Sequence, residues 1–416
     1  MNKSSLSLTT ALCLACGLLH AQDPADTQQD LRINPDIEFS QVKSTVSYPS
    51  YVRTGSNHII MNGDDWSALA QYLRGADSTR INIVHIGDSH LQADMGTAVT
   101  RNRLSQQFGT AGRALVIPFK LAGTNEPNDY TISTSAVMNK SRLLKTPWSA
   151  PMGFTGISLQ PSKELFDFNL SCNEPFDSIE VLYTGMDLQL YQCDSIAAYN
   201  EPGRLKIGLE SPVTTASLTL KGTKDIAIHG FNLLKGSTGI AYNVIGNNGA
   251  TYGTYNALEN FANDISKFNP ALIIISLGTN EAFGKTSNEE LNSQIYKMVN
   301  NLRYECPDAK LLITTPSECQ RKIVTRRRKG RRRRYTSYLV NANINRLRNV
   351  ILNFGKEHGI PVYDFYDVAG GEGSSFKWLK DQYLNKDRIH LTHSGYNLQG
   401  NLFTDALEEA LTPADK

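Results

Sequence analysis

The chain has 416 residues, of which 40% are hydrophobic and 20% are charged, and its formal net charge is +2. This composition is typical of an ordinary soluble protein, and the length allows a sizeable core, more readily as two domains than as one. After residue 21 no segment is long and apolar enough to cross a membrane as a helix, so we expect no transmembrane segment.

Residues 1–21 predict a secretory signal peptide. Lys3 provides a basic start, and Leu6–Leu19 form an apolar core that is too short to span a bilayer. Lipid attachment at Cys16 is a weaker alternative, because Cys13 stands where a lipobox has leucine. We therefore expect an exported protein that is periplasmic, secreted or held at the cell surface.

Residues 22–60 are polar and irregular and predict a lead-in arm, followed by a short helix capped by Asp64 or Asp65. Five short segments rich in Ile, Leu and Val then have the composition of strands buried on both faces. These predicted strands are Ile81–Ile86, Tyr242–Ile245, Ala271–Leu277, Lys310–Thr315 and Pro361–Asp364. Helices are predicted at Gln92–Phe108, Tyr255–Lys267, Asn288–Leu302, Asn343–Phe354 and Ser394–Leu411. The alternation predicts an α/β domain with a five-stranded parallel sheet, formed by residues 61–115 and 237–416.

Residues 116–236 interrupt this alternation and predict a β-rich, sandwich-like insertion. Its apolar and polar residues alternate in short segments separated by turn residues. The predicted strands of the insertion are Phe166–Leu170, Ser178–Tyr183, Leu188–Gln192, Ala216–Leu220 and Ile226–Leu233.

Four cysteines remain after the predicted signal peptide, and an even number in an exported protein permits disulfide bonds. The nearest-neighbour pairings are Cys172 with Cys193 and Cys306 with Cys319, but connectivity does not follow from sequence. None of the four lies near a histidine at metal-ligand spacing, so we expect no zinc site.

Ser89 is the candidate nucleophile, because it directly follows a predicted strand and Gly87 permits a tight turn there. A serine in this position is commonly only a helix cap. A serine hydroxyl needs a base to remove its proton, and His390 is the candidate. Asp387 lies three residues before it, as expected for the carboxylate that orients the imidazole.

Two further segments follow predicted strands and supply candidate oxyanion donors. Gly249 belongs to the sequence GNNGA and offers a backbone N–H, and Asn280 belongs to GTN and offers a side-chain amide. The carboxyl ends of parallel strands lie at one edge of the sheet, so Ser89 and both donors are expected at one site. Each of the two is otherwise explained as an ordinary turn residue.

The four blocks GDS at Gly87–Ser89, the glycine at Gly249, GTN at Gly278–Asn280 and DxxH at Asp387–His390 resemble those of the SGNH (GDSL-type) hydrolases, in the same order. The resemblance covers about 61–115 and 237–416 and implies a three-layer α/β/α sandwich. It implies Ser89 as nucleophile, with its own backbone also in the oxyanion hole, His390 as base, Asp387 as its partner, and Gly249 and Asn280 as oxyanion donors. No cofactor is implied.

Within that superfamily, the sequences HIGDSHLQAD and GNNGA are similar to those of the peptidoglycan O-acetylesterase branch. His90 replaces the leucine of the plain GDSL motif, which fits this branch better than a lipase. Members of this branch also carry a β-rich insertion resembling a carbohydrate-binding module between the first two blocks.

Arg321–Arg334 contains ten basic residues and no acidic one, whereas the rest of the chain has 32 basic and 40 acidic residues. We expect this segment to be a loop at the same end of the sheet as Ser89. A solvated loop is the simpler interpretation, and docking to an anionic envelope polymer is the more specific hypothesis. Nucleic acid is not expected, since no nucleic-acid-binding motif is present.

The sequence therefore predicts an exported, metal-independent serine esterase that removes O-acetyl groups from a carbohydrate polymer, with peptidoglycan as one candidate. Two alternatives remain open. The same residues serve equally in a lysophospholipase or thioesterase, although no contiguous apolar stretch suggests a lipid groove. The second alternative is a non-catalytic, glycan-binding protein of the cell surface.

Overall fold

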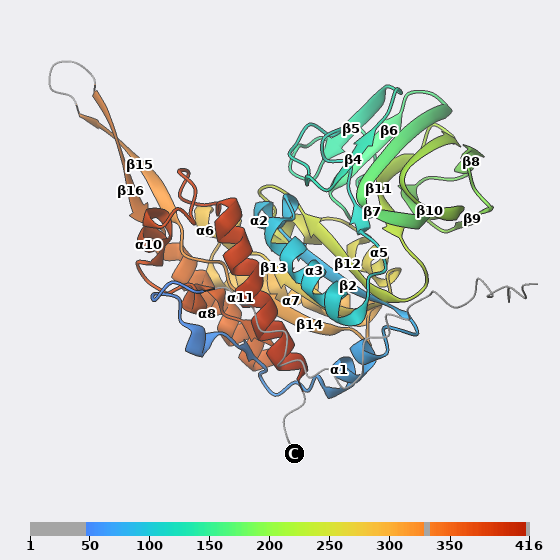
Figure 1. Ribbon diagram of the computed structural model, residues 1–416. Coiled ribbons are helices and arrows are strands. Elements are labelled where there is room, and N and C mark those ends of the chain that lie inside the picture. Colours follow the sequence, from blue (N-terminus) through green and yellow to red (C-terminus); the bar gives the residue numbers. More distant parts are fainter. Residues whose placement is uncertain (1–46, 328–332, 413–416) are drawn as a thin grey trace, which may run out of the picture. The chain divides into compact units, whose positions relative to one another are not determined.

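The computed structural model describes residues 47–327 and 333–412, all of which fall within one compact unit. The predicted signal peptide and most of the lead-in arm lie outside the described residues. Two β-sheets and a two-stranded ribbon organise the described part of the chain (Figure 1).

The first sheet, sheet A, has six strands in the order β1-β17-β14-β13-β2-β12. Its parallel strands are β2 (Arg80–Gly87), β12 (Gly239–Gly246), β13 (Pro270–Ser276), β14 (Lys310–Thr314) and β17 (Val362–Tyr363). These are the five strands that the sequence predicts. The sixth, β1 (Ile59–Ile60), pairs antiparallel with β17 and was not expected, since two residues carry no recognisable strand pattern.

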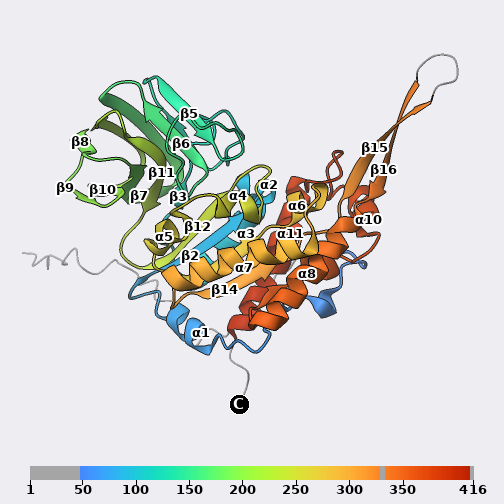
Figure 2. The same cartoon turned by 180° about the vertical axis from the view of Figure 1, so that it is seen from behind.

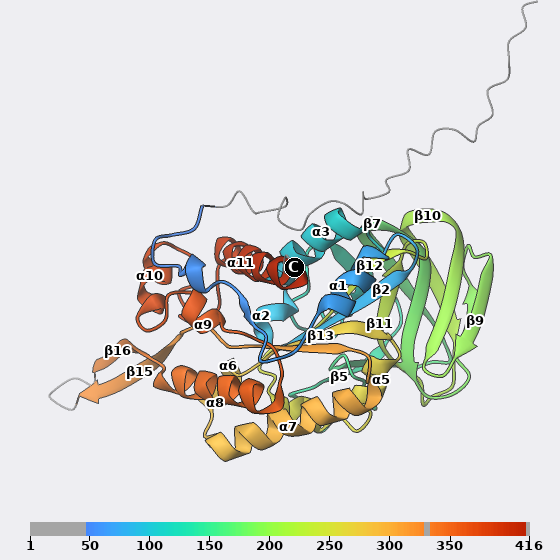
Figure 3. The ribbon, with the colours of Figure 1, turned by 90° about the horizontal axis from the view of Figure 1, so that it is seen from below.

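Helices cover both faces of sheet A, which confirms the three-layer α/β/α arrangement. One face carries α1 (Ser67–Arg74), α3 (Met95–Phe108) and α11 (His393–Leu411). The other carries α4 (Tyr252–Asn256), α5 (Phe261–Ser266), α7 (Asn288–Glu305) and α8 (Ala342–His358). Figure 2 shows α7 and α8 in front of the sheet, and Figure 3 shows the layers edge-on.

Strand β13 shows why both faces need helices. Leu272 and Ile274 are buried against one layer, and Ile273 and Ile275 are buried against the other. Because successive side chains of a strand point to opposite faces, an uninterrupted apolar run requires cover on both sides.

Two predicted helices are divided in the structure. The helix predicted at Gln92–Phe108 is preceded by the short α2 (Ser89–Gln92), and α3 begins only at Met95 because Asp94 adopts a left-handed conformation with φ of 54°. Asp94 is buried and pairs with the guanidinium groups of Arg101 and Arg113, which hold the break in place. The helix predicted at Tyr255–Lys267 is likewise split into α4 and α5.

The second sheet, sheet B, has nine strands and encloses a separate hydrophobic core. Its pairings are antiparallel, and its two long strands are β7 (Leu165–Thr184) and β10 (Arg204–Lys221). The others are β3 (Ala114–Val116), β4 (Tyr130–Ser133), β5 (Met138–Arg142), β6 (Ile157–Pro161), β8 (Gln189–Gln192), β9 (Ala197–Glu201) and β11 (Ala227–Leu234). The segments predicted as two strands, Phe166–Leu170 and Ser178–Tyr183, both belong to β7.

The arginine-rich segment is a β-ribbon, so the expected loop at Arg321–Arg334 is corrected. Strand β15 (Gln320–Arg327) pairs antiparallel with β16 (Arg333–Val340), from Gln320 opposite Val340 to Arg327 opposite Arg333 (Figure 1). Residues 328–332 of the segment lie outside the described residues. Threonine, valine and tyrosine flank the arginines on both sides, and such residues favour extended pairing.

Cys172, Cys193, Cys306 and Cys319 are all free thiols, so neither of the two nearest-neighbour disulfide pairings is formed. Burial raises the pKa of the Cys306 thiol to about 11. Across residues 47–327 and 333–412, the structure contains no helix with the length and apolar character of a membrane span.

Candidate active site

The turn at the carboxyl end of β2 presents Ser89. Gly87 ends the strand, and a Cβ atom there would lie 2.7 Å from the Leu91 side chain and 2.9 Å from the Ser276 carbonyl oxygen, so the turn has room only for glycine. Asp88 is buried and caps α2 by accepting a hydrogen bond from the His90 N–H at 2.9 Å. This arrangement leaves the side chain of Ser89 partly exposed at the first position of the helix.

His390 lies beside Ser89, although 301 residues separate them in the chain. The Nε2 atom of His390 is 2.8 Å from the Oγ atom of Ser89, and its Nδ1 atom is 2.7 Å from Oδ2 of Asp387. Asp387 accepts two further hydrogen bonds, from the backbone N–H groups of Ile389 and His390. The carboxylate therefore fixes Nδ1 as the protonated nitrogen and leaves Nε2 free to accept the serine proton.

Partial burial alone would raise the pKa of Asp387, but the hydrogen bonds that it accepts from Ile389 and His390 outweigh this and lower the pKa. The carboxylate therefore remains ionised at neutral pH. An ionised carboxylate at Nδ1 stabilises the imidazolium that forms when His390 takes up a proton.

Gly249 lies in the loop after β12 with φ of 84°, a left-handed conformation that favours glycine. The loop is tied to the nucleophile turn, because the Asn247 N–H donates to the Gly87 carbonyl oxygen. Neither the Gly249 N–H nor the Ser89 N–H has a hydrogen-bond partner among the described residues. Both groups are therefore available to a ligand, as an oxyanion hole requires.

Asn280 is the second residue of α6 (Thr279–Phe283), which follows β13, and its side chain contacts Asp88 of the nucleophile turn. Its Nδ2 atom donates to the Ala250 carbonyl oxygen at 2.9 Å and to Oδ2 of Asp88 at 3.1 Å. Both amide hydrogens are thus engaged. Asn280 donates to an oxyanion only by sharing or exchanging one of these bonds.

The structure also reveals a clamp on the oxyanion loop that sequence reasoning missed. Gln92 lies three residues after Ser89, and its Oε1 atom accepts the Asn248 N–H at 2.8 Å. Its Nε2 atom donates to Thr124 at 2.9 Å and to the backbone of Asn125 at 2.7 Å. Because Thr124 and Asn125 come from a turn more than 120 residues away from Asn248, no local pattern marks this contact.

His90 packs against the candidate base. The centroids of the His90 and His390 rings are 5.3 Å apart, and Nδ1 of His90 is 3.0 Å from the Tyr396 hydroxyl. Burial lowers the pKa of His90, partly offset by the nearby carboxylate of Asp88. An uncharged His90 supports the His390 ring without repelling the imidazolium.

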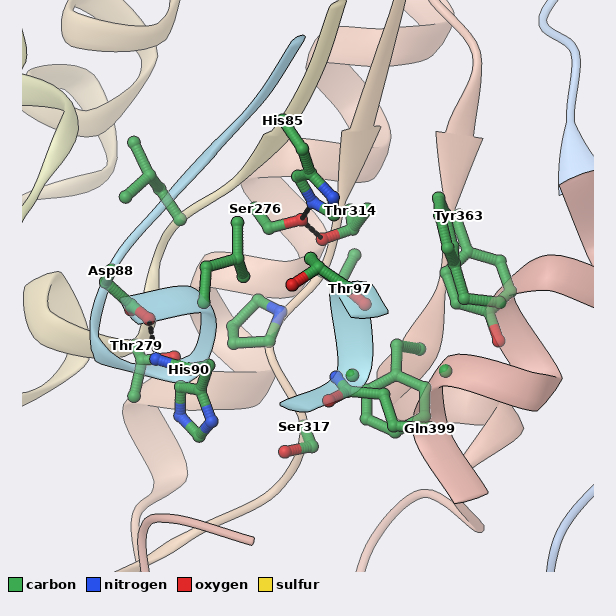
Figure 4. Close-up of a pocket in the computed structure, with 18 of the residues that line it drawn as sticks. His85, Asp88, His90, Thr97, Ser276, Thr279, Thr314, Ser317, Tyr363 and Gln399 are labelled. Atoms are coloured by element: carbon green, nitrogen blue, oxygen red, sulfur yellow. Dashed lines mark hydrogen bonds between the residues drawn. The ribbon is translucent and has the colours of Figure 1, made fainter. Parts of the chain in front are cut away.

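A small cavity of about 70 Å³ lies behind the nucleophile turn, between sheet A and α11 (Figure 4). His85 lies at its inner end, where its Nε2 atom is 2.7 Å from the Ser276 hydroxyl. Burial lowers the pKa of His85 to about 3, so this ring is neutral. Neither Ser89 nor His390 lines the cavity, so it is not the place where an ester reacts.

Glu281 follows Asn280 and is buried beneath the site. Its Oε1 atom accepts the N–H of Tyr252 at 2.8 Å, while Oε2 has no partner among the described residues. Burial raises the pKa of Glu281 to about 7. No sequence pattern marks this carboxyl group.

Part of the chain is similar to a known protein family. Residues 229–398 match the GDSL-like lipase/acylhydrolase family. No curated protein matches the chain. Among solved structures, one described as a peptidoglycan O-acetylesterase has a TM-score of 0.69 at 18% identity and covers 87% of this chain and 98% of its own. This similarity shows that the two chains share a fold.

Other solved structures are similar over a smaller part of the chain. A lipase/acylhydrolase from Enterococcus faecalis is 20% identical, with a TM-score of 0.30, and covers 43% of this chain and 80% of its own. An acetyl xylan esterase is 16% identical, with a TM-score of 0.30, and covers 39% and 79%. Similarities of this extent do not support a conclusion about this chain.

Proposed function

We propose that this protein, whose residues 229–398 belong to the GDSL-like lipase/acylhydrolase family, is an exported serine esterase that removes O-acetyl groups from a carbohydrate polymer such as peptidoglycan. The observation that carries the proposal is the chain of contacts from Ser89 to His390 to Asp387, at 2.8 and 2.7 Å. The fold shared with a structure described as a peptidoglycan O-acetylesterase, over 87% of this chain, supports the choice of substrate.

The geometry assigns each group a step. His390 removes the proton of the Ser89 hydroxyl as its oxygen attacks the ester carbonyl, and Asp387 stabilises the resulting imidazolium. The oxyanion accepts hydrogen bonds from the backbone N–H groups of Ser89 and Gly249 and from the Asn280 amide. Each such donor contributes roughly 10²- to 10³-fold to turnover.

The proton on His390 then passes to the departing sugar hydroxyl, which leaves an acetyl group on Ser89. In the second half, His390 removes a proton from a water molecule that attacks this acetyl ester, and the same donors again receive the oxyanion. Acetate is released and the serine hydroxyl is restored.

Acetate release tests the proposal. Purified protein is incubated with O-acetylated peptidoglycan, with O-acetylated plant glycans and with p-nitrophenyl acetate, alongside the variants Ser89→Ala and His390→Ala. Both variants are expected to lose release from every substrate. His393→Ala is the matched control, because this histidine is close to His390 in sequence and its side chain is exposed. Unchanged turnover in Ser89→Ala contradicts the proposal.

The acyl-chain length of the preferred substrate distinguishes a sugar esterase from a lipase that uses the same catalytic residues. We expect p-nitrophenyl acetate to be hydrolysed faster than the octanoate, because the proposed substrate carries acetyl esters. Preference for octanoate favours a lysophospholipase or thioesterase instead.

The proposal includes contact of Arg321–Arg334 with an anionic envelope polymer. The base of the ribbon is joined to the loop of the candidate base, since the Gln320 N–H donates to the Arg388 carbonyl oxygen at 2.9 Å and the Arg388 guanidinium lies over the Tyr338 ring. Ten cations in this segment attract polyanions, with a strength that falls as salt rises. Neutralising four of the arginines should weaken binding to such polymers at low salt, and no change there contradicts the contact.

A further inference from the structure

A second pocket, of about 190 Å³, borders the loop that carries Gly249. This volume corresponds to about six water molecules at liquid density, which is room for a pyranose-sized group. Its walls include Gln92 and Asn248 beside sheet A, Arg142 at the end of β5, and Leu144 and Lys145 from the turn that follows.

The pocket lies next to the place where the ester reacts. Asn248 directly precedes Gly249, and the Leu144 side chain lies over Gly249, where a Cβ atom would be 2.6 Å from it. Gln92 stands on the same short helix as Ser89. A group bound in the pocket is therefore a neighbour of an oxyanion at Gly249.

The pocket carries positive charge without a counter-charge. Arg142 and Lys145 line it, no acidic residue does, and neither cation forms an ion pair with a described residue. The Nη1 atom of Arg142 donates to the Gly123 carbonyl oxygen at 3.0 Å, which positions the guanidinium while leaving its remaining donors free. Unpaired cations in a pocket of this kind favour a carboxylate, which a guanidinium binds through paired hydrogen bonds.

We propose that this pocket is a substrate subsite for a carboxylate-bearing part of the acylated polymer, held by Arg142 and Lys145 while the neighbouring acetyl ester reaches Ser89. The inference rests on the proposed esterase function and specifies its substrate as an acetylated glycan with a carboxylate near the ester. Leu144 places the subsite on the Gly249 side of the reacting carbonyl.

The test compares one polymer in two forms. Soluble fragments of O-acetylated peptidoglycan are used as prepared and after carbodiimide-mediated amidation of their carboxylates, and kcat/KM for acetate release is measured for each. The wild-type protein should prefer the native fragments by about tenfold or more. In the double variant Arg142→Gln with Lys145→Gln, the ratio of kcat/KM for native fragments to kcat/KM for amidated fragments should fall toward one. The main cause should be a higher KM for the native fragments.

Two further variants keep the test decisive. Lys163→Gln with Lys221→Gln removes the same charge from exposed positions of the β-rich insertion outside the pocket and should leave the ratio as in the wild type. Lys145→Glu alters one exposed side chain and preserves the bond from Arg142 to Gly123, so it should reduce the ratio without affecting the fold. A ratio that stays high in both pocket variants, or a wild-type ratio near one, overturns the subsite and leaves the esterase function standing. Absence of acetate release from either form and from p-nitrophenyl acetate overturns both.

Discussion

The Nδ2 atom of Asn280 lies 3.1 Å from the carboxylate of Asp88, the residue directly before the candidate nucleophile. The other carboxylate oxygen of Asp88 accepts the His90 N–H at 2.9 Å. One buried side chain therefore joins the nucleophile turn after β2 to the oxyanion amide after β13. Because both carboxylate oxygens of Asp88 accept hydrogen bonds, this side chain fixes the distance between the nucleophile turn after β2 and Asn280 after β13.

Replacing Asp88 by asparagine tests this role. The variant offers one acceptor where the carboxylate offers two, so either Asn280 or the His90 N–H loses its partner. Turnover of p-nitrophenyl acetate should fall by about 10- to 100-fold, with little change in KM. Asp65→Asn, at an exposed position before α1, is the control and should match the wild type. Unaltered kcat in Asp88→Asn contradicts a positioning role.

Asp387→Asn should reduce turnover by about 10⁴-fold at neutral pH, because an amide no longer enforces protonation at Nδ1 of His390. The loop keeps its backbone, since asparagine retains an oxygen for the Ile389 and His390 N–H groups. The rate is measured with p-nitrophenyl acetate. Lys386→Gln, at the adjacent exposed position, serves as the control. A loss of less than tenfold means that Asp387 does not orient the base.

The sequence alone is sufficient to locate the five parallel strands of sheet A and the residues of the candidate triad. Buried strands such as β13 consist of consecutive isoleucines and leucines, a pattern that can be recognised in the sequence alone. Ser89, Gly249 and Asn280 follow such strands, so the topology of a parallel sheet brings them to one edge. The two-residue β1 has no comparable pattern, which is why it was missed.

Features that depend on contacts between residues far apart in the chain could not be predicted from the sequence. The left-handed Asp94 breaks the expected helix because two buried arginines, one of them outside that helix, hold its carboxylate. The Gln92 clamp joins three segments whose spacing has no periodicity. The arginine run suggested a solvated loop from its charge, whereas the pairing of β15 with β16 is set by the uncharged residues around it.

Gly249→Ala should lower turnover by about 100-fold or more, because a Cβ atom collides with Leu144 and the left-handed backbone disfavours alanine. The collision and the backbone strain are separable. Adding Leu144→Ala removes the collision and should restore part of the activity. Gly236→Ala places the same strain, at φ of 62°, where nothing lies within 4 Å, and should cost stability of about 1–2 kcal/mol without loss of turnover. Full activity of Gly249→Ala contradicts the oxyanion assignment.

Gln92→Ala should lower kcat by about tenfold while KM changes little, since the Asn248 N–H loses its acceptor and Gly249 is less firmly placed. Gln92→Glu keeps an oxygen for Asn248 but loses the donor to Asn125, so its kcat should be intermediate. The measurement is steady-state kinetics with p-nitrophenyl acetate. Gln106→Ala, at an exposed position of α3, should equal the wild type. Equal kcat in Gln92→Ala and Gln106→Ala contradicts the clamp.

Glu281 should make stability depend on pH. Burial raises the pKa of Glu281 from 4.5 to about 7, so between these values the folded state binds more protons than the unfolded state. The free energy of unfolding therefore falls as pH rises through this window, by up to about 3 kcal/mol at 1.36 kcal/mol per pH unit. The contribution is complete below pH 4.5 and absent above pH 7.

Glu281→Gln removes this titration and keeps an oxygen for the Tyr252 N–H. Other buried groups also titrate: burial lowers the pKa of His85 to about 3 and of His229 to about 4, and raises that of Glu408 to about 7. Because these groups are common to both proteins, they cancel in the difference between variant and wild type. Urea unfolding at pH 5 and pH 8 should show the variant gaining stability over the wild type as pH rises. If the variant and the wild type differ in free energy of unfolding by the same amount at pH 5 and at pH 8, Glu281 is ionised in the folded protein throughout this range.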